Sequence, residues 1–561
     1  MKRPWLSHYG TVPHTLQYPQ GTMSEAVFAC AQKRSGWEAL SFMGRSISYG
    51  ELAGEIRKTA EAFWGLGVRK GDRVTLCLPN IPQTVYCLYG LNELGAEVSL
   101  IHPLSAEKEI VFYLKEVGST VLVTIHQFYD KLLKVQEEYP LKHLIITDID
   151  DALSGIKKWG YRIGIKRKFL KLQPAEFLLT WKSFLAGAKP YEKADNTAKD
   201  GAVILFSGGT TGVNKGILLS NGNLNALGFQ TAAMCACPVE GKRILAAMPM
   251  FHGFGLGVCV HTALINGMTS ILVPRFNVKE YAHLIRKERP NYIAGVPTLY
   301  EALTRTDYLD GADLSCLMGV FSGGDSLSVE LKKRMDRFLA ERGATVRIRE
   351  GYGTTECVTA SCLTPDHEER EGSIGLPYPD MEYKICKVGT TEEVPCGEEG
   401  EICLAGPTVM LEYLGHPEET ADALRLHEDG RRWLHTGDLG VMDEDGFIYF
   451  RQRLKRIIVT SGYNVYPSQI ENVLDGHPKV QLSCVIGVPD PYRMHRVKAY
   501  IVPKQGIEPT EELKIELLEY CKTYIAKYAC PREVEFREDL PKTLVGKVSY
   551  KKLEEENKSL S

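Results

Sequence analysis

The sequence lacks the long hydrophobic runs and the N-terminal features that direct a chain into or across a membrane. No apolar stretch in the 561 residues reaches the length of about 18 residues that a membrane-spanning helix requires. Residues 1–30 contain Lys2 and Arg3 but no apolar segment that would complete a secretory signal. We therefore expect a protein that works in the cytoplasm.

Paired cysteines and a strong excess of one charge are also absent. The fifteen cysteines are scattered, and the closest pair, Cys235 and Cys237, has no His or Cys partner at zinc-finger spacing, which favours free thiols in a reducing compartment. The 67 basic and 70 acidic residues give a net charge of −3, which argues against a general nucleic-acid binder. No nucleic-acid partner is expected.

What is present is an alternation of short apolar runs with amphipathic segments. The segment from Ser46 to Gly67 predicts a short strand and then a helix, with Leu52, Ile56 and Phe63 on one helical face. Further strands are predicted at 74–76, 98–101, 120–125, 243–247, 269–273, 292–296, 318–322 and 346–349. Buried strands separated by helices favour parallel sheets, so the sequence predicts an α/β fold.

A loop rich in glycine and hydroxyl side chains follows the apolar run that ends at Phe206. Backbone N–H groups and hydroxyls between Ser207 and Lys215 can surround phosphate oxygens, and Lys215 supplies a positive charge. The pattern is not a Walker A loop, because Gly216 follows Lys215 where Ser or Thr is required. The apolar run 217–219 predicts a return strand, which places the loop at a hairpin tip. A surface loop without a ligand is the alternative interpretation.

Further short motifs follow this loop in a fixed order. They are Pro-Met-Phe-His-Gly-Phe-Gly at 249–255, Ser-Gly-Gly-Asp at 322–325, Tyr-Gly-Thr-Thr-Glu at 352–356, Trp-Leu-His-Thr-Gly-Asp at 433–438, Arg-Leu-Lys at 453–455, and Pro-Lys-Thr with Gly-Lys within 541–547. With this order and spacing, roughly residues 25–555 resemble the adenylate-forming superfamily of acyl-CoA synthetases, luciferases and peptide-synthetase adenylation domains. Within it, the chain is most similar to bacterial long-chain fatty-acid–CoA ligases.

The resemblance implies an architecture within the α/β class. It implies a large N-terminal domain of two α/β sheets plus a β-rich subdomain, followed by a small mobile α+β C-terminal domain. We place the N-terminal AMP-binding domain at residues 1–454 and the C-terminal domain, which carries the catalytic lysine, at residues 455–561. Lys455 is then the expected hinge about which the C-terminal domain swings between two half-reactions.

The resemblance also implies the reaction and its participants. ATP would activate a carboxylic acid to acyl-AMP, with Mg²⁺ neutralising the phosphates, and CoA would then accept the acyl group. Catalysis of such a step rests on positioning and electrostatic stabilisation. The implied catalytic residues are Lys547, Thr355, Glu356 and His252, with Glu356 also as the metal ligand. The implied nucleotide-binding residues are Ser207, Gly208, Gly209, Thr210, Thr211, Gly212, Lys215, Gly323, Gly324, Asp325, Tyr352, Gly353, Thr354, Asp438 and Arg453.

Individual roles follow from the chemistry of these side chains within that resemblance. Tyr352 would stack on adenine, and Asp438, which as a carboxylate only accepts hydrogen bonds, suits the ribose hydroxyls. Arg453 would add donors beside the ribose, while Lys547 would bridge the acid and the α-phosphate. The sequence departs from the family pattern at three places, one of which is His495-Arg496 in place of a common Gly-Glu pair. Asn214 replaces a proline before Lys215, which removes a restraint on φ, and Gln452 replaces the glycine before Arg453.

The pocket motif bears on the class of acid. Amino-acid-adenylating relatives carry an aspartate after the motif phenylalanine, whereas this chain has His252 after Phe251. The expected substrate is therefore an acid without a charged amine, with a fatty acid favoured. An aryl-CoA ligase and a stand-alone enzyme that loads a carrier protein stay open as alternatives. A non-catalytic nucleotide-binding protein is a further alternative.

A basic run covers residues 157–171. It contains seven Lys or Arg residues and no acid, interleaved with apolar residues such as Trp159 and Ile163. Such a segment can bind anionic lipid, at about 1 kcal/mol for each basic residue near the surface. Because Gly160 and Gly164 weaken a helix, the sequence favours a solvated basic loop over a peripheral membrane contact.

Overall fold

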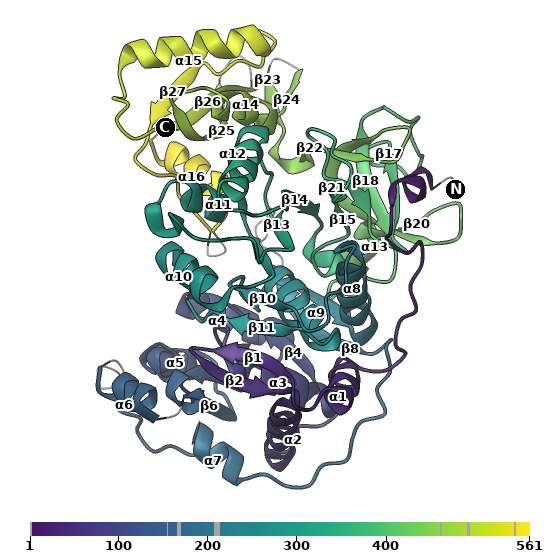
Figure 1. The fold of residues 1–561 in the computed structure, drawn as a ribbon, viewed down its shortest axis with the longest axis vertical. Coiled ribbons are helices and arrows are strands. Elements are labelled where there is room, and N and C mark those ends of the chain that lie inside the picture. Colours follow the sequence, from purple (N-terminus) through teal and green to yellow (C-terminus); the bar gives the residue numbers. More distant parts are fainter. Residues whose placement is uncertain are drawn as a thin grey trace.

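The computed structural model describes residues 3–153, 155–164, 170–206, 214–275, 277–460, 463–490, 494–543 and 546–560. Two parallel-rich sheets form the N-terminal part, drawn in purple to teal in Figure 1. The strands from Glu382 onward form separate sheets, except Glu412–Tyr413, which joins one of the parallel-rich sheets. This arrangement confirms the predicted α/β class.

The first parallel-rich sheet comes mostly from the first 220 residues. Within the described residues its spatial order is β19 (Glu412–Tyr413), β9 (Gly216–Ser220), β8 (Gly201–Phe206), β4 (Glu97–Leu100), β3 (Arg73–Cys77), β5 (Val121–Ile125), β6 (His143–Thr147) and β7 (Leu178–Thr180). Neighbours from β8 to β7 are parallel, while β8 and β9 form the predicted hairpin. The ends of the phosphate-loop candidate are therefore fixed by a sheet.

The second parallel-rich sheet contains the later strands of the N-terminal part. Its order is β16 (Leu376–Pro377), β15 (Cys362–Leu363), β14 (Ile348–Tyr352), β13 (Gly319–Gly323), β12 (Tyr292–Gly295), β10 (Arg243–Ala246), β11 (Thr269–Leu272), β1 (Glu38–Phe42) and β2 (Arg45–Ser48). The neighbours from β14 to β1 pair in parallel. The earliest strands of the chain thus close the far edge of this later sheet.

Helices pack on both sheets and between them. In chain order they are α1 (Met23–Lys33), α2 (Tyr49–Gly65), α3 (Pro82–Glu93), α4 (Glu107–Val117), α5 (Tyr129–Glu138), α6 (Gly155–Gly164), α7 (Trp181–Ala186), α8 (Asn221–Met234), α9 (Thr262–Ile265), α10 (Val278–Glu288), α11 (Pro297–Thr304) and α12 (Val329–Ala340). The predicted face of α2 is buried at Leu52, Ile56 and Phe63. Every residue of α3 is buried, so this helix lies inside the core.

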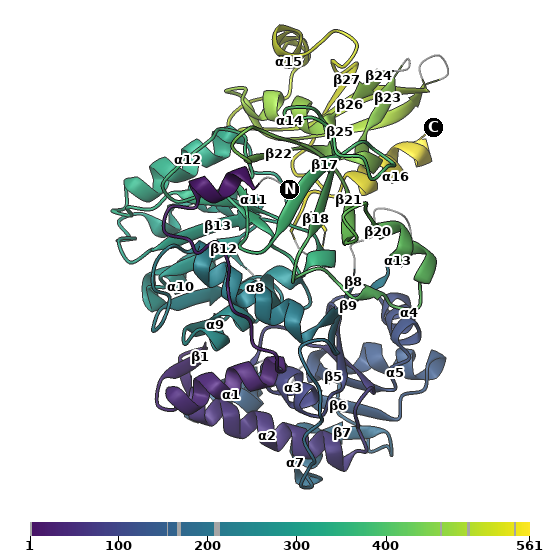
Figure 2. The same cartoon turned by 90° about the vertical axis from the view of Figure 1, so that its right-hand side faces the viewer.

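The segment after Glu382 forms the predicted β-rich subdomain. Its strands are β17 (Glu382–Cys386), β18 (Gly400–Ala405), β20 (Leu424–Leu426), β21 (Arg432–Met442) and β22 (Ile448–Arg453), all paired antiparallel, with α13 (Pro417–Ala423) beside them. The N-terminal arm crosses to this region: His8 Nε2 lies 3.6 Å from Asp445 Oδ1, and Tyr9 OH donates to the Pro377 carbonyl of the neighbouring β16 at 2.8 Å. Figure 2 shows that arm running along the outside of the molecule.

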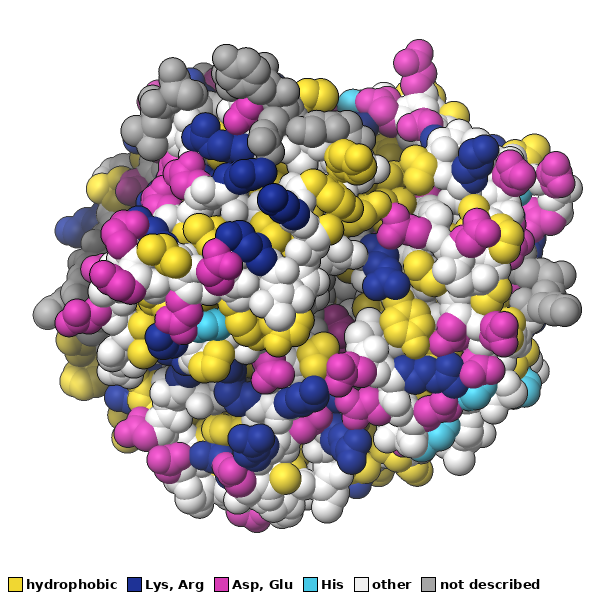
Figure 3. Space-filling model, turned by 90° about the horizontal axis from the view of Figure 1, so that it is seen from above, with side chains coloured by type: hydrophobic (Ala, Val, Ile, Leu, Met, Phe, Trp, Pro, Cys, Tyr) yellow, Lys and Arg dark blue, Asp and Glu magenta, His cyan; other side chains and the backbone are white. Residues whose placement is uncertain are grey.

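The C-terminal unit has its own hydrophobic core, which begins at Ile458. Its strands are β23 (Ile458–Thr460), β24 (Tyr463–Val465), β25 (Val480–Asp490), β26 (Met494–Pro503) and β27 (Glu533–Phe536), and its helices are α14 (Pro467–Asp475), α15 (Glu511–Tyr524) and α16 (Tyr550–Leu560). Figure 3 views the end of the molecule that carries this unit: acidic and basic side chains are interspersed around a central hollow.

The structure corrects the expectation for the basic run. Residues from Gly155 to Gly164 form the helix α6, not a loop. Tyr161 OH donates to Asp148 Oδ1 at 3.0 Å and Arg162 Nε lies 2.6 Å from Asp150 Oδ2, so tertiary contacts outweigh the weak helix preference of glycine. Lys166, Arg167 and Lys168 lie outside the described residues. None of the described helices has the length and apolar content to cross a bilayer.

Candidate active site

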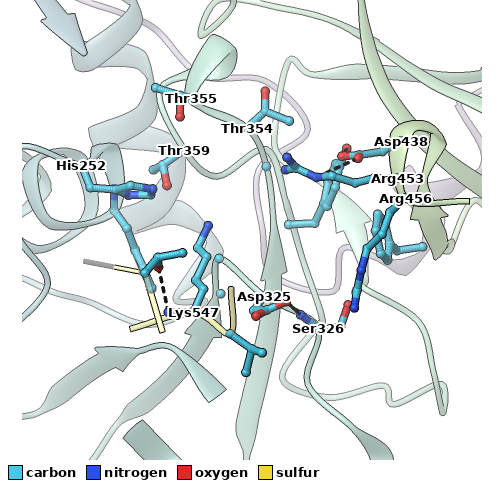
Figure 4. Close-up of a pocket in the computed structure, with 18 of the residues that line it drawn as sticks. His252, Asp325, Ser326, Thr354, Thr355, Thr359, Asp438, Arg453, Arg456 and Lys547 are labelled. Carbon is cyan, nitrogen blue, oxygen red and sulfur yellow. Dashed lines mark hydrogen bonds and ion pairs between the residues drawn. The ribbon is translucent and has the colours of Figure 1, made fainter. Parts of the chain in front are cut away.

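A cavity of about 1280 Å³ lies where the N-terminal sheets, the β-rich subdomain and the C-terminal unit meet. In Figure 4 the Lys547 side chain points into it between His252 and Asp325, with Asp438 and Arg453 on the other side. Residues separated by up to three hundred positions in the sequence are thus brought together in one space.

The parallel pair β13 and β14 positions two of the motifs. Gly323 is register partner of Gly351, so both strands end at the same edge of the sheet. Gly324 then adopts φ +84°, and Asp325 accepts from the Ser326 N–H at 3.0 Å. Loops at the carboxyl ends of parallel strands form the usual binding crevice of open α/β sheets.

A strained turn holds the motif at 352–356 against the pocket motif at 249–255. Val358 has φ +66° and ψ −58°, and the Thr359 N–H donates to the Cys357 carbonyl at 2.8 Å, which is the geometry of a γ-turn that non-glycine residues rarely adopt. The turn presses the Val358 carbonyl onto Gly253, where a Cβ atom would lie 1.7 Å from the oxygen. A Cβ on Gly353 would lie equally close to the Thr359 carbonyl. Glycine is therefore required in both motifs.

Asp438 and Arg453 are held together by antiparallel pairing. They are register partners on β21 and β22, and Arg453 Nε lies 3.3 Å from Asp438 Oδ1. Tyr352 OH donates to Asp438 Oδ2 at 2.8 Å. Burial raises the pKa of Asp438, although the charge of Arg453 opposes that rise. Among the described residues, Asp438 Oδ1 is a buried atom that accepts no hydrogen bond, so it can receive one from a ribose hydroxyl.

Glu401 and His427, which the sequence did not single out, form a hydrogen-bond network with the Asp438 turn. Glu401 Oε1 accepts from the Gly437 N–H at 2.9 Å, and Glu401 Oε2 lies 2.8 Å from His435 Nδ1. His427 Nε2 lies 2.9 Å from His435 Nε2, and burial lowers the pKa of His427 to about 4. Only cross-strand register identifies this network, because Glu401 is distant in sequence.

Glu356 and Lys215 lie near a shared tyrosine. Tyr413 OH donates to Glu356 Oε1 at 2.8 Å, and Lys215 Nζ lies 5.1 Å from the centre of the Tyr413 ring. Lys215 also forms an ion pair with Glu419 at 3.2 Å. Lys215 and Glu356 thus share Tyr413 as a neighbour, and Lys215 is paired with Glu419.

The loop residues Ser207, Gly208, Gly209, Thr210, Thr211 and Gly212 lie outside the described residues. At the end of this segment, Asn214 Nδ2 donates to Tyr113 OH at 2.8 Å. Where the family has a proline, this chain therefore anchors the same position by a side-chain hydrogen bond.

His252 is neutral in this cavity. Burial lowers the pKa of His252 to about 3, and the nearby charge of Lys547 contributes to a smaller extent. Its Nδ1 accepts from the Phe254 N–H at 3.2 Å, so the remaining ring proton belongs on Nε2. Phe254 opens a π-helical segment, Phe254–His261, which is a rare geometry that often marks functional sites. His252 can donate one hydrogen bond but cannot serve as a positive charge.

Lys547 reaches the cavity from a turn of the C-terminal unit. Its backbone N–H donates to Thr543 Oγ1 at 3.1 Å, and Thr298 Oγ1 donates across the domains to the Gly546 carbonyl at 2.9 Å. Desolvation lowers the pKa of Lys547, and the charge of Asp325 counteracts this. Thr298, on the first turn of α11, was not predicted, since nothing in its local sequence indicates a contact 248 positions away.

Comparison with known proteins identifies the family. The model described as AMP-binding enzyme matches residues 27–414, and that described as AMP-binding enzyme C-terminal domain matches residues 469–547. The chain belongs to the AMP-binding enzyme family. The resemblance predicted from the motifs is thereby confirmed, whereas the individual site residues stay predictions.

Full-length relatives fit this assignment. The long-chain-fatty-acid–CoA ligase of Bacillus subtilis (strain 168) is 34% identical over 566 residues, covering 99% of this chain and 98% of the relative. That of Salmonella typhimurium is 33% identical over 571 residues, with the same coverage. A solved anthranilate CoA ligase, AuaEII, in complex with anthranoyl-AMP, has a TM-score of 0.84 at 25% identity and covers 98% of this chain and 99% of its own.

The glycine contact yields a prediction about stability. Gly253→Ala should destabilise the protein by about 1–3 kcal/mol, because its Cβ would collide with the Val358 carbonyl. Gly54→Ala, at an open position within α2, should be neutral or stabilising by about 0.5–1 kcal/mol. Thermal and urea unfolding of both variants measure the difference. Equal stability of the two variants would contradict the close approach.

The cross-domain hydrogen bond yields a prediction about rate. Thr298→Val should slow acyl-adenylate formation by about five- to tenfold, the effect of one lost hydrogen bond, because Lys547 loses a positioning contact. Thr298→Ser should retain the rate, and so should Thr304→Val, whose hydroxyl bonds only within α11. ATP–pyrophosphate exchange measures this half-reaction. Equal losses in the serine and valine variants would show that the hydroxyl does not position Lys547.

Proposed function

We propose that this protein is an AMP-forming acid–thiol ligase that converts a fatty acid to its acyl-CoA. The observation that carries the proposal is that Lys547 shares one cavity with His252, Glu356 and Asp438. A cation in that position can contact both an acid and an α-phosphate. A site that only binds nucleotide would not need a cation that also contacts an acid.

The first half-reaction forms the acyl-adenylate. A carboxylate oxygen attacks the α-phosphorus of ATP, and the bond to the β-phosphate breaks to release pyrophosphate. Lys547 stabilises the negative charge that the attacking carboxylate and the α-phosphate share, while Thr355 donates to the α-phosphate. Because Lys547 is desolvated before substrate arrives, its charge interacts more strongly with the developing negative charge than it would in water.

The second half-reaction transfers the acyl group. The sulfur of CoA attacks the acyl carbonyl, the bond to the AMP oxygen breaks, and the thiol proton is released. Asp438 and Arg453 hold the ribose through both halves, with Tyr352 and Gly323-Gly324-Asp325 around the adenine. The shared cavity and the pairing of Arg453 with Asp438 support these roles, which the family resemblance implies.

The residues around Glu356 fit a magnesium ion. Its carboxylate lines the cavity on the same side as Lys215, and one carboxylate completed by substrate phosphates is a donor set typical of Mg²⁺. When bound, the ion would neutralise charge on the departing pyrophosphate. We infer that Glu356 is its ligand from the protein.

A fatty acid is the acid that we favour. The long-chain-fatty-acid–CoA ligases named above align with this chain from end to end. Aromatic rings are among the groups that line the cavity. The ring centroids of Phe251 and His102 lie 4.3 Å apart, and those of Phe206 and Tyr113 lie 4.4 Å apart. An aryl acid is the second candidate, because AuaEII, a ligase of anthranilate, shares the fold.

We also propose that residues 1–454 and 455–561 are the two moving units and that the enzyme works in the cytoplasm at a membrane surface. The separate core that starts at Ile458 supports a boundary near Lys455. An enzyme that collects long-chain acids would gain from contact with the lipid in which they partition.

The reaction itself is tested with a graded panel of acids. Enzyme, ATP, Mg²⁺ and CoA should give acyl-CoA, AMP and pyrophosphate, with long-chain acids converted faster than benzoate or anthranilate. Mass spectrometry of the thioesters identifies both the acid and the acceptor. Preference for the aryl acids would overturn the fatty-acid assignment, and adenylate without thioester would point to a carrier-protein acceptor.

Domain alternation is tested by separating the half-reactions. Lys547→Ala should slow adenylation by about 10²-fold or more and spare thioester formation from supplied acyl-adenylate. Lys455→Pro, which fixes φ near −65°, should keep much of the adenylation activity and lose thioester formation. Equal losses in both halves for both variants would rule out a swing about Lys455.

A further inference from the structure

Helix α6 carries an apolar face that is turned away from the protein. Ile156 is 87% exposed, Trp159 is 68% exposed and Ile163 is 44% exposed. Positions i, i+3 and i+7 fall on one side of a helix, so these side chains form a single stripe. Contiguous exposed apolar surface on a folded protein usually marks a binding site.

The opposite face of α6 is fixed to the N-terminal domain. Lys157 Nζ donates to the Met43 carbonyl, Tyr161 OH bonds to Asp148, and Arg162 pairs with the buried Asp150. These anchors hold the helix in one orientation. The apolar stripe is therefore a fixed feature of the surface. Figure 1 shows helix α6 at the outer edge of the molecule, beside α5 and β6.

The charge around the stripe indicates its partner. Residues 155–171 contain no acid. In the described part of that range Lys158 is a half-buried residue of α6 and Lys171 is exposed, while Lys157 is already engaged by the Met43 carbonyl. A short helix with a basic polar side and Trp and Ile on the other is the composition of helices that lie in the interface of an anionic bilayer. Tryptophan in particular favours the headgroup region.

We propose that α6 docks this protein on the surface of an anionic lipid bilayer, with Ile156, Trp159 and Ile163 inserted between headgroups and the neighbouring lysines contacting them. The charge complementarity favours lipid over a second copy of the chain. The docking does not depend on which acid the enzyme activates.

Co-sedimentation with vesicles tests the proposal without using activity. The full-length protein should bind phosphatidylcholine vesicles that contain phosphatidylglycerol, and high salt should weaken the binding. Trp159→Glu should weaken it about tenfold or more, since a buried apolar side chain is replaced by a repelled charge. Lys158→Gln should weaken it about fivefold. Ile515→Glu, at a position 61% exposed on α15, is the matched control and should bind as the wild type does.

The alternatives give distinct results. Equal binding of wild type and Trp159→Glu, or equal binding to vesicles with and without phosphatidylglycerol, would overturn the proposal. A change in oligomeric state for Trp159→Glu by sedimentation velocity, without a change in vesicle binding, would instead identify the stripe as a contact between copies. If the Trp159→Glu variant converts a short, water-soluble acid at the wild-type rate, the variant is folded. If the wild-type protein shows no ligase activity, the vesicle-binding result still stands, because it does not depend on activity.

Discussion

The site depends on placing a half-buried cation, Lys547, into a cavity built by a different hydrophobic core. Desolvation disfavours that charge, as the direction of its pKa shift shows, and Asp325 only partly compensates. Thr298 supplies a hydrogen bond to the turn across the domains. A cation held in this way is ready for the negative charge of an acid and a phosphate, and in the domain rotation proposed above it would leave together with the C-terminal unit.

The N-terminal domain, by contrast, fixes its share of the site rigidly. A carbonyl oxygen packs so closely against each of Gly253 and Gly353 that a Cβ atom there would lie 1.7 Å from it. Val358 adopts an unfavourable γ-turn between these contacts. Strain of this kind persists only where the surrounding packing enforces it. The pocket motif and the Thr354–Glu356 motif are therefore locked to each other, while the lysine from the other domain is not.

Much of this arrangement could be predicted from the sequence because its signals are local. Apolar runs of strand length predicted the parallel sheets, and the order and spacing of the glycine-rich motifs indicated a family resemblance that implied a shared site. Contacts between distant segments gave no such signal: Thr298, Glu401 and His427 act through cross-strand or cross-domain partners. The α6 prediction was wrong for a related reason. The sequence around Gly160 opposes a helix, but Asp148 and Asp150, on a neighbouring segment, supply the partners that stabilise it.

The positions of α6 and the C-terminal unit decide whether membrane docking through α6 and rotation about Lys455 can occur together. Figure 1 shows α6 at one end of the N-terminal domain and the C-terminal unit at the other. A helix that held the membrane beside Lys547 would hinder any rotation about Lys455, because the moving unit would meet the bilayer. Docking through α6 avoids this conflict: the N-terminal domain is restrained at the surface, and the unit that carries Lys547 can turn in solvent. Membrane attachment and the exchange of half-reactions are therefore physically compatible in this fold.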